Sequence, residues 1–232
     1  MQSDIKASFS KAAQTYDKHA EFQYFAAQKL VNAIHETPNH ILDIGCGTGI
    51  LTELLRQKFS NARFTLLDIS PAMLKVSQVK LGMNNIDYIC GSADDIALIG
   101  KIINKNKIDM LVSNLCFQWL GNPCNLIKTY QSYIPTHVSV LLDTSFYQWY
   151  ESVKKICPNF KPPISLLPRD SVNNIHAYHT QYKTALDFLR SQKQLGTLNN
   201  IGNPLTVTQL KNACIFFETV YDARISYDLG IL

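Results

Sequence analysis

Short apolar stretches recur along the chain after residue 40, and amphipathic segments separate them. The stretches are HILDI (40–44), RFTLLDI (63–69), DYICG (87–91), MLVSNL (110–115) and VSVLLD (138–143). They are rich in leucine and β-branched residues, which is typical of strands buried on both faces. Residues 51–59 and 71–81 carry apolar side chains three and four positions apart, which predicts helices. This alternation predicts an α/β fold with a doubly wound, Rossmann-like parallel sheet.

Further elements are expected on either side of this repeat. Residues 3–36 precede the first strand and predict one or two helices. Residues 146–170 contain Pro158, Pro162, Pro163 and Pro168, which predicts an insertion with a poorly helical tail. The remaining pattern predicts a strand, two helices and a last strand at 175–183, 185–196, 205–218 and 224–232. No repeat or low-complexity linker divides the sequence, so residues 1–232 are predicted to form a single domain.

The composition narrows the class of protein. With 46% hydrophobic and 17% charged residues the sequence is typical of a soluble globular protein, and a net charge of +4 does not require a nucleic-acid partner. No apolar run approaches the roughly 18 residues of a membrane span. Six cysteines without a CxxC pair or metal-ligand spacing indicate reduced thiols and no metal site. We therefore expect a cytoplasmic protein, most simply a monomer, with no membrane or nucleic-acid partner.

The first predicted strand leads into a glycine-rich loop, DIGCGTGI (43–50). Glycines permit tight turns and close approach of a ligand, and the following helix offers free N–H groups at its start. The spacing Gly45-x-Gly47-x-Gly49 differs from the G-x-G-x-x-G fingerprint of dinucleotide-binding proteins. Asp43, ahead of the first glycine, would repel a phosphate but suits a cation such as an amine or a sulfonium.

Polar residues also follow the next two predicted strands. Asp68 ends the second strand, where a carboxylate can accept hydrogen bonds from both hydroxyls of a ribose. Ser92 and Asp94 follow the third strand, where they can bind the polar edge of an adenine. A sugar, a base and a charged amino acid make up S-adenosylmethionine (SAM), which we therefore predict as the cofactor. A doubly wound protein whose loop binds a nucleotide, or nothing, is the alternative.

The D-x-G-x-G-x-G loop, the acidic end of the second strand and the leading helices together resemble class I SAM-dependent methyltransferases. Three further stretches resemble the BioC-type enzymes, the malonyl-acyl-carrier-protein O-methyltransferases of biotin synthesis. They are FSKAAQTYDKHAEFQ, with Phe9, Ala12, Ala13, Tyr16 and Ala20; SNLCFQWLGNP, with Ser113, Asn114, Leu115, Gln118 and Trp119; and ALDFLRSQKQLG followed by LTVTQL. The resemblance implies about seven strands with the last antiparallel, an N-terminal helical lid (1–38) and a substrate-side insertion (about 146–173).

The resemblance also implies roles for individual residues. The stretch from Asp43 to Gly49, Cys46 included, would hold the methionyl part of the cofactor, Asp68 the ribose, and Ser92 with Asp94 the adenine. The remaining cofactor-site candidates are Ile69, Met73, Ala93 and Asn114. Tyr16 would either close over the methyl donor, because aromatic faces suit cations, or pack its own helix. Gln118 and Trp119 would line the acceptor pocket, unless Trp119 belongs to the core. Asn114, at the carboxyl end of its strand, is also a catalytic candidate on the acceptor side.

The implied reaction methylates the free carboxylate of malonyl on an acyl-carrier protein, or of malonyl-CoA. A carboxylate is already ionised at neutral pH, so no general base is needed. Arg169 is the candidate for binding it, since arginine matches a carboxylate bidentately. Basic residues outnumber acidic ones between Glu151 and Lys211, which indicates either a solvated face or a docking surface for an acidic partner. Lys154, Lys155 and Lys161 are the candidates for contact with the carrier protein.

The sequence departs from the family in the half that would bind the acceptor. IPTHVSV replaces the usual Pro-Gly-Gly turn before the fifth strand, and DTSFYQWYESV after it is shortened and lacks a glycine. The family's arginine in this region falls on Ser165, with Arg169 four residues later. The departures leave two alternatives open. One is a methyltransferase for another small molecule or protein, such as the related complex I assembly factors. The other is a non-catalytic accessory protein of the same fold.

Overall fold

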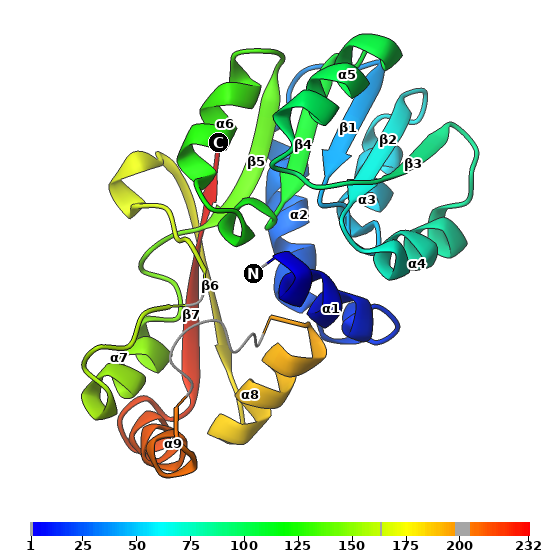
Figure 1. The fold of residues 1–232 in the computed structure, drawn as a ribbon. Helices are drawn as coiled ribbons and strands as arrows, with labels where there is room; N and C mark the ends of the chain where they lie inside the picture. The colour runs from blue at the N-terminus through cyan, green and yellow to red at the C-terminus, as the bar shows by residue number, and fades with distance from the viewer. Residues whose placement is uncertain (1, 163, 198–204) are drawn as a thin grey trace.

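The computed structural model describes residues 2–162, 164–197 and 205–232. Within these ranges a seven-stranded sheet in the order β3-β2-β1-β4-β5-β7-β6 forms the centre of the molecule (Figure 1). The strands are β1 (His40–Ile44), β2 (Arg63–Asp68), β3 (Ile86–Cys90), β4 (Met110–Asn114), β5 (Thr136–Leu141), β6 (Asn174–Gln181) and β7 (Arg224–Ile231). β1 to β5 pair in parallel, and β7 pairs antiparallel with both β5 and β6. The predicted doubly wound sheet with an antiparallel last strand is confirmed.

Helices of the described residues cover both faces of this sheet. They are α1 (Gln2–Ala12), α2 (Glu21–Ala33), α3 (Ile50–Lys58), α4 (Pro71–Leu81), α5 (Ile96–Asn106), α6 (Pro123–Gln131), α7 (Tyr147–Ile156), α8 (Ala185–Gln194) and α9 (Val207–Tyr221). Three short 3-10 helices also occur there: η1 (Tyr16–His19), η2 (Phe117–Trp119) and η3 (Arg169–Ser171). None of the helices in these ranges combines the length and apolar character that crossing a membrane would need.

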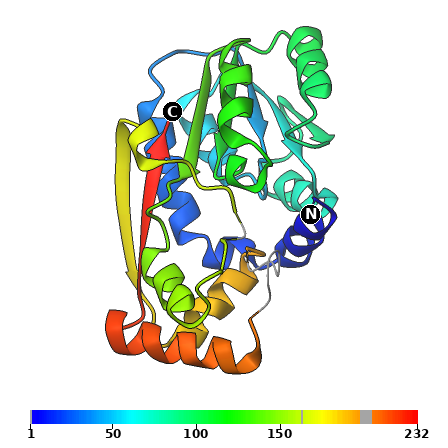
Figure 2. The ribbon, with the colours of Figure 1, turned by 60° about the vertical axis from the view of Figure 1, so that its left-hand side comes forward.

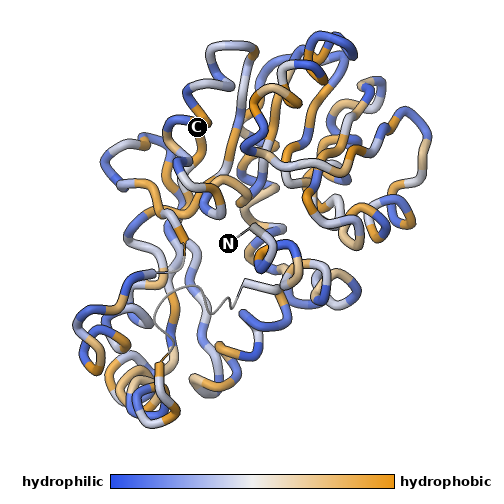
Figure 3. Tube along the Cα trace, in the orientation of Figure 1, coloured by the Kyte–Doolittle hydropathy of each residue, from blue (hydrophilic) through white to orange (hydrophobic). Residues whose placement is uncertain are grey.

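Two hydrophobic cores lie on opposite faces of the sheet. Ile41 belongs to a core shared with α2, α3, α7, α8 and α9, whereas its neighbour Leu42 belongs to a core shared with α5 and α6. The same alternation separates Leu66 from Leu67 on β2. Figure 3 shows hydrophobic and hydrophilic residues alternating along the helices, as expected for helices with one buried face. Strands buried on both faces explain why their sequences read as nearly continuous apolar runs.

The helix α4 shows how local sequence sets an element boundary. The Ser70 hydroxyl accepts a hydrogen bond from the Met73 N–H at 3.2 Å, and Pro71 occupies the first turn. A side-chain oxygen before the helix satisfies one of its free N–H groups, and proline has its φ already fixed for a helix start. The helix runs from Pro71 to Leu81, which confirms the predicted helix at 71–81.

The C-terminal part extends the molecule beyond the five parallel strands β1 to β5. β6 and β7 run side by side from the sheet toward α7, α8 and α9 (Figures 1 and 2). The first part of the expected insertion is the helix α7, which packs against α9 and β7. The proline-rich residues after it contain no helix between 157 and 162 or between 164 and 168. The helix expected from residue 205 begins at Val207, since Thr206 caps it and pairs reciprocally with Gln209.

Candidate active site

The sheet has its topological switch point between β1 and β4. β2 and β3 follow on one side of β1, and β4 and β5 follow on the other side. In doubly wound sheets ligands bind outside the carboxyl ends of the strands at this point. The glycine-rich loop, the end of β2 and the end of β4 all meet there. The fold alone therefore brings the glycine-rich loop, Asp68 and Asn114 to the same edge of the sheet.

The glycine-rich loop leaves β1 and turns sharply under the end of β2. Gly45 has a φ of +68° and donates its N–H to the Leu67 carbonyl at 2.7 Å. A Cβ on Gly45 would lie 2.4 Å from the Cys116 Sγ, inside van der Waals contact. Gly49, with a φ of +85°, is similarly crowded by Ser77 and Leu81. Only glycine tolerates both this positive φ and such close neighbours, so the loop has no side chains at these two positions.

Asp68 ends β2 and holds the loop in place. Its Oδ2 accepts the Gly47 N–H at 2.9 Å and its Oδ1 accepts the Ser70 N–H at 2.8 Å. The side chain lines the cavity described below although the residue is only 8% exposed. Burial raises the pKa of Asp68 above its usual range, and the two N–H donors oppose that rise. Each carboxylate oxygen keeps a further lone pair, so Asp68 can still accept hydroxyl hydrogen bonds from a ligand.

Asp43 lies deeper than its position in the sequence suggested. The residue is completely buried, its Oδ2 accepts the Thr52 hydroxyl at 2.6 Å, and its Oδ1 has no hydrogen-bond partner among the described residues. Burial raises the pKa of Asp43 to about 7, with the Thr52 hydrogen bond opposing the rise. Asp43 therefore supports the loop from behind, next to the start of α3, and is not part of the cavity wall.

A large cavity opens at this edge of the sheet, with a volume of about 830 Å³. A cavity of this size lies in the range of small-molecule sites. Its wall brings together most of the residues that the sequence singled out. They are Tyr16, Gly45, Asp68, Ile69, Met73, Ser92, Ala93, Asn114, Gln118 and Trp119.

Several other candidates lie near this wall without forming it. Cys46, Gly47 and Gly49 shape the loop, and Cys46 is buried within it. Asp94 is exposed and accepts a hydrogen bond from the Ser92 hydroxyl at 2.6 Å, so it orients Ser92 at the cavity. These residues therefore shape the cavity indirectly, through the loop backbone or through a neighbouring side chain.

Tyr16 and Asn114 connect the N-terminal segment to the site. Tyr16 begins η1, lies on the cavity wall and packs near Phe9, which in turn meets Trp119 edge to face at 5.4 Å. Burial and the nearby Asp68 raise the pKa of Tyr16 well above its usual range, so the phenol stays protonated. The Asn114 amide donates to the Gln23 carbonyl at 3.0 Å and accepts from the Ser139 hydroxyl at 2.6 Å. Asn114 thereby ties α2 to the end of β4.

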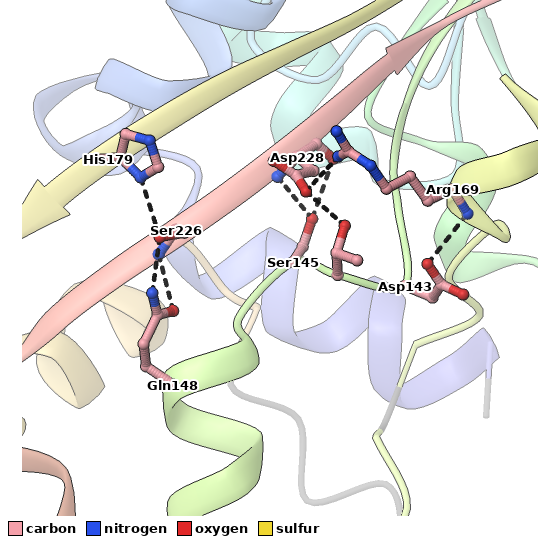
Figure 4. A network of polar contacts seen from close by, with 8 residues as sticks. Asp143, Ser145, Gln148, Arg169, His179, Ser226 and Asp228 are labelled. Atoms are coloured by element: carbon pink, nitrogen blue, oxygen red, sulfur yellow. Dashed lines mark hydrogen bonds and ion pairs between the residues drawn. The ribbon is translucent and has the colours of Figure 1, made fainter. Parts of the chain in front are cut away.

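Arg169 lies outside the cavity in a separate polar network (Figure 4). Its guanidinium forms an ion pair with Asp228 on β7 at 2.6 Å, and its backbone N–H donates to Asp143 at 3.0 Å. Ser145 exchanges two 3.0 Å hydrogen bonds with the Asp228 backbone in the same network. The network fastens the segment around η3 to β7, so the geometry gives no support to the predicted contact between Arg169 and a substrate.

The far wall of the cavity is aromatic, which the sequence reasoning did not identify. Phe22, Phe146 and Tyr178 surround Tyr227, with ring centroids 4.4, 4.9 and 5.9 Å from it. Trp149, Tyr150, Phe160 and Tyr182 also line this part, which we call the aromatic chamber together with the first four. The signal available was the density of aromatic residues in SFYQWYES and in IHAYHTQY. Nothing in the sequence pattern showed that the two stretches face each other.

Cations on the cavity wall come from two segments. Among the described residues, Lys18 of η1 and Arg190 of α8 are the lysine and the arginine that line it. Arg190 pairs with Asp187 at 3.2 Å while its side chain is 70% exposed. An exposed pair of this kind is weak, so the guanidinium remains available to an entering carboxylate. No group of three or more His, Cys, Asp or Glu side chains in the described part of the chain could hold a metal ion.

Comparisons with known proteins agree with this geometry. Residues 41–132 match a family described as a methyltransferase domain. A malonyl-[acyl-carrier protein] O-methyltransferase of Ilyobacter polytropus is 29% identical over 226 residues, which is 89% of this chain and 85% of the relative. A Paenibacillus protein of the same name is 26% identical over 98% of this chain and 94% of its own. A solved complex between the Haloferax volcanii Trm112 methyltransferase activator and a methyltransferase contains a similar fold, with a TM-score of 0.51, 14% identity and 96% coverage of both chains.

The sheet order, the bare glycine loop, the spare acceptors of Asp68 and the matching domain define a class I methyltransferase with SAM as its cofactor. Within that class, the chain is a relative of the malonyl-[acyl-carrier protein] O-methyltransferases over most of its length. The resemblance drawn from residues 9–20 and 113–119 is thus confirmed.

Proposed function

We propose that the protein transfers the methyl group of SAM to the free carboxylate of malonyl on an acyl-carrier protein, giving the malonyl methyl ester used in biotin synthesis. The observation that carries the proposal is a single cavity that joins the cofactor residues Gly45 and Asp68 to the aromatic chamber. The names of the relatives support the choice of acceptor. The proposal treats residues 1–232 as one domain that works as a cytoplasmic monomer.

The residues present suit this cofactor. Bound SAM supplies a methyl group made electrophilic by the sulfonium. The bare backbone at Gly45 leaves room for the methionyl part. Asp43, whose Oδ1 lacks a partner among the described residues, lies behind the loop, where the positive charge of the cofactor would favour its ionised form. Asp68 would accept the ribose hydroxyls through its free lone pairs. Ile69, Met73 and Ala93 would pack against the adenine, with Ser92 at its polar edge.

Methyl transfer to a carboxylate needs placement more than proton transfer. The carboxylate is ionised at neutral pH, so its oxygen is already a nucleophile. The protonated Tyr16 phenol cannot serve as a base, but its ring can face the sulfonium and its hydroxyl can donate a hydrogen bond. The aromatic chamber would exclude water and hold the acceptor close to the methyl group, which is where most of the rate enhancement would arise.

The acceptor carboxylate needs a cation, and the cavity offers Lys18 and Arg190. We favour Arg190, because a guanidinium can bind a carboxylate through two parallel hydrogen bonds. Lys154, Lys155 and Lys161 remain candidates for contact with the acidic carrier protein. The aromatic chamber also favours a second candidate acceptor, an apolar small molecule with a nucleophilic oxygen or nitrogen.

The proposal is tested by following cofactor binding and product formation separately. Calorimetric titration with S-adenosylhomocysteine (SAH), the product form of the cofactor, should show one site. Mass spectrometry should then detect a gain of one methyl group on malonyl-acyl-carrier protein, and no gain on the acetyl form, which lacks a free carboxylate. Cofactor binding without transfer to any malonyl thioester would refute the acceptor while leaving the methyltransferase class intact.

A further inference from the structure

The N-terminal segment reaches across the cofactor half of the site. α1 packs against α4, and the Ser10 hydroxyl lies 2.8 Å from that of Ser70, the residue that caps α4 and donates its N–H to Asp68. On its other side, the Ser8 carbonyl would lie only 2.9 Å from a Cβ placed on Gly196, just after α8. The segment is therefore held between the cofactor half and the acceptor half of the molecule.

Asp17 makes the most direct connection between this segment and the glycine-rich loop. Its Oδ1 accepts the hydroxyl of Thr48, which stands between Gly47 and Gly49, at 2.5 Å. Its Oδ2 forms an ion pair with Lys80 near the end of α4, also at 2.5 Å. Both oxygens of one carboxylate are thus committed to two different elements of the cofactor half. The side chains of Asp17 and Lys80 are 34% and 20% exposed, so this pair is better shielded than an ordinary surface pair.

The neighbouring residue in sequence explains what this connection can do. Tyr16 and Asp17 are adjacent in η1, yet Tyr16 lines the cavity while Asp17 contacts the loop and α4. Because the two residues are adjacent, contacts that hold the Asp17 side chain in place also restrict the orientation of the Tyr16 side chain. Asp17, Thr48 and Lys80 do not line the cavity themselves, so any effect they have on the cofactor is exerted through the loop and through η1.

We propose that Asp17, with Thr48 and Lys80, forms a latch that locks η1 onto the glycine-rich loop and so positions Tyr16 over the bound cofactor. Asp17 is a positioning residue in this proposal, since it touches neither cofactor nor acceptor. By linkage, if the closed latch strengthens cofactor binding, the cofactor must strengthen closure by the same factor. The loop and the N-terminal segment would then order together when the cofactor binds.

The test uses SAH, so it does not depend on the identity of the acceptor. Asp17→Ala should bind SAH about tenfold more weakly than the unmodified protein in calorimetry, within the range usual for such coupling. SAH should also protect Lys6 and Lys11 of α1 from trypsin in the unmodified protein, and this protection should be lost in Asp17→Ala. Lys80→Met should show the same two effects in weaker form. Lys75→Met, an exposed lysine on the same helix without an ion pair among those described, is the matched control.

A double-mutant cycle separates the latch from a general loss of stability. If Asp17 acts through Lys80, the variant carrying both Asp17→Ala and Lys80→Met should bind SAH no more weakly than Asp17→Ala alone. Additive losses in the cycle, or wild-type SAH affinity and wild-type protection in Lys80→Met and Asp17→Ala, would overturn the proposal. Should Asp17→Ala fail to fold, Asp17→Asn replaces it, because that variant keeps the acceptor for Thr48 but turns an amide NH2 toward Lys80 in place of the carboxylate oxygen.

Discussion

Replacing Gly45 by alanine should damage the loop in two separable ways. The first is backbone strain, since Gly45 has a φ of +68°. A non-glycine residue in this left-handed region costs roughly 1–2 kcal/mol. The second is steric, since the new Cβ would lie 2.4 Å from the Cys116 Sγ and 2.6 Å from its Cβ. Forcing an extra carbon into a packed interior costs typically about 1–3 kcal/mol.

The two costs together predict a loss of about 2–5 kcal/mol in the free energy of unfolding for Gly45→Ala. That is a large share of the roughly 5–15 kcal/mol that stabilises a typical domain. Gly47→Ala provides the matched control, because Gly47 has a φ of +54° but no atom of the described residues within 4 Å of the position that a Cβ would take. It should lose only the strain cost, about 1–2 kcal/mol.

Urea denaturation followed by circular dichroism measures all of these free energies on one scale. Adding Cys116→Gly to Gly45→Ala should recover the steric part, because the two clashing atoms belong to the Cys116 side chain. The reasoning fails if Gly45→Ala is no less stable than Gly47→Ala, or if removing the Cys116 side chain recovers nothing. Either result would mean that the loop relaxes away from Cys116 at little cost.

Three further predictions concern the cofactor and acceptor groups. Asp43 has a pKa of about 7 in the folded protein, against about 4 in the unfolded chain, so the folded state holds the extra proton between these values. Stability should therefore fall as pH rises from about 4 to about 7, and Asp43→Asn should flatten this part of a urea-midpoint profile. Asp68→Ala should weaken SAH binding in calorimetry by at least about tenfold, since two charge-assisted hydrogen bonds to a ribose would be lost. Arg190→Gln should raise the KM for the malonyl acceptor more than Arg169→Gln does. Arg169→Gln should change the free energy of unfolding by less than about 1 kcal/mol. The opposite ranking of the KM values would restore the role that the sequence predicts for Arg169.

The cofactor half of the molecule could be predicted from the sequence because its information is local. Each strand that carries a candidate cofactor residue is a short apolar run, and the residue lies at the carboxyl end of the run or within a few positions of it, as Asp68 does at the end of β2. The helix at 71–81 carries both a serine cap and a proline in its first turn, so its bounds could be given from the sequence. Once the sheet is known to be parallel, the carboxyl ends of its strands must meet at one edge.

The depth of Asp43 shows the limit of this local reasoning. Its position two residues before the first glycine predicts a carboxylate at the mouth of the loop, but Asp43 lies within β1. Only the packing of Thr52 on α3 reveals that the carboxylate is buried behind the loop. Arg169 shows the same limit, since its partner Asp228 lies fifty-nine residues away and on the last strand. Contacts over such separations leave no periodic signal in the sequence.

The aromatic chamber explains why the acceptor is harder to infer than the cofactor. Its walls come from α2, α7, β6, β7 and the segments next to them. The rings pack on one another: Phe22 on Tyr227, Tyr227 on Phe146, and Tyr150 on Phe160. Replacing one ring therefore changes the packing of its neighbours. The edge of the sheet around Gly45 and Asp68, by contrast, is built largely from backbone and short polar side chains. The N-terminal segment contacts both halves, through Ser10 and Asp17 on one side and through Ser8 beside Gly196 on the other. This one segment is therefore the structural link between the cofactor residues and the aromatic chamber.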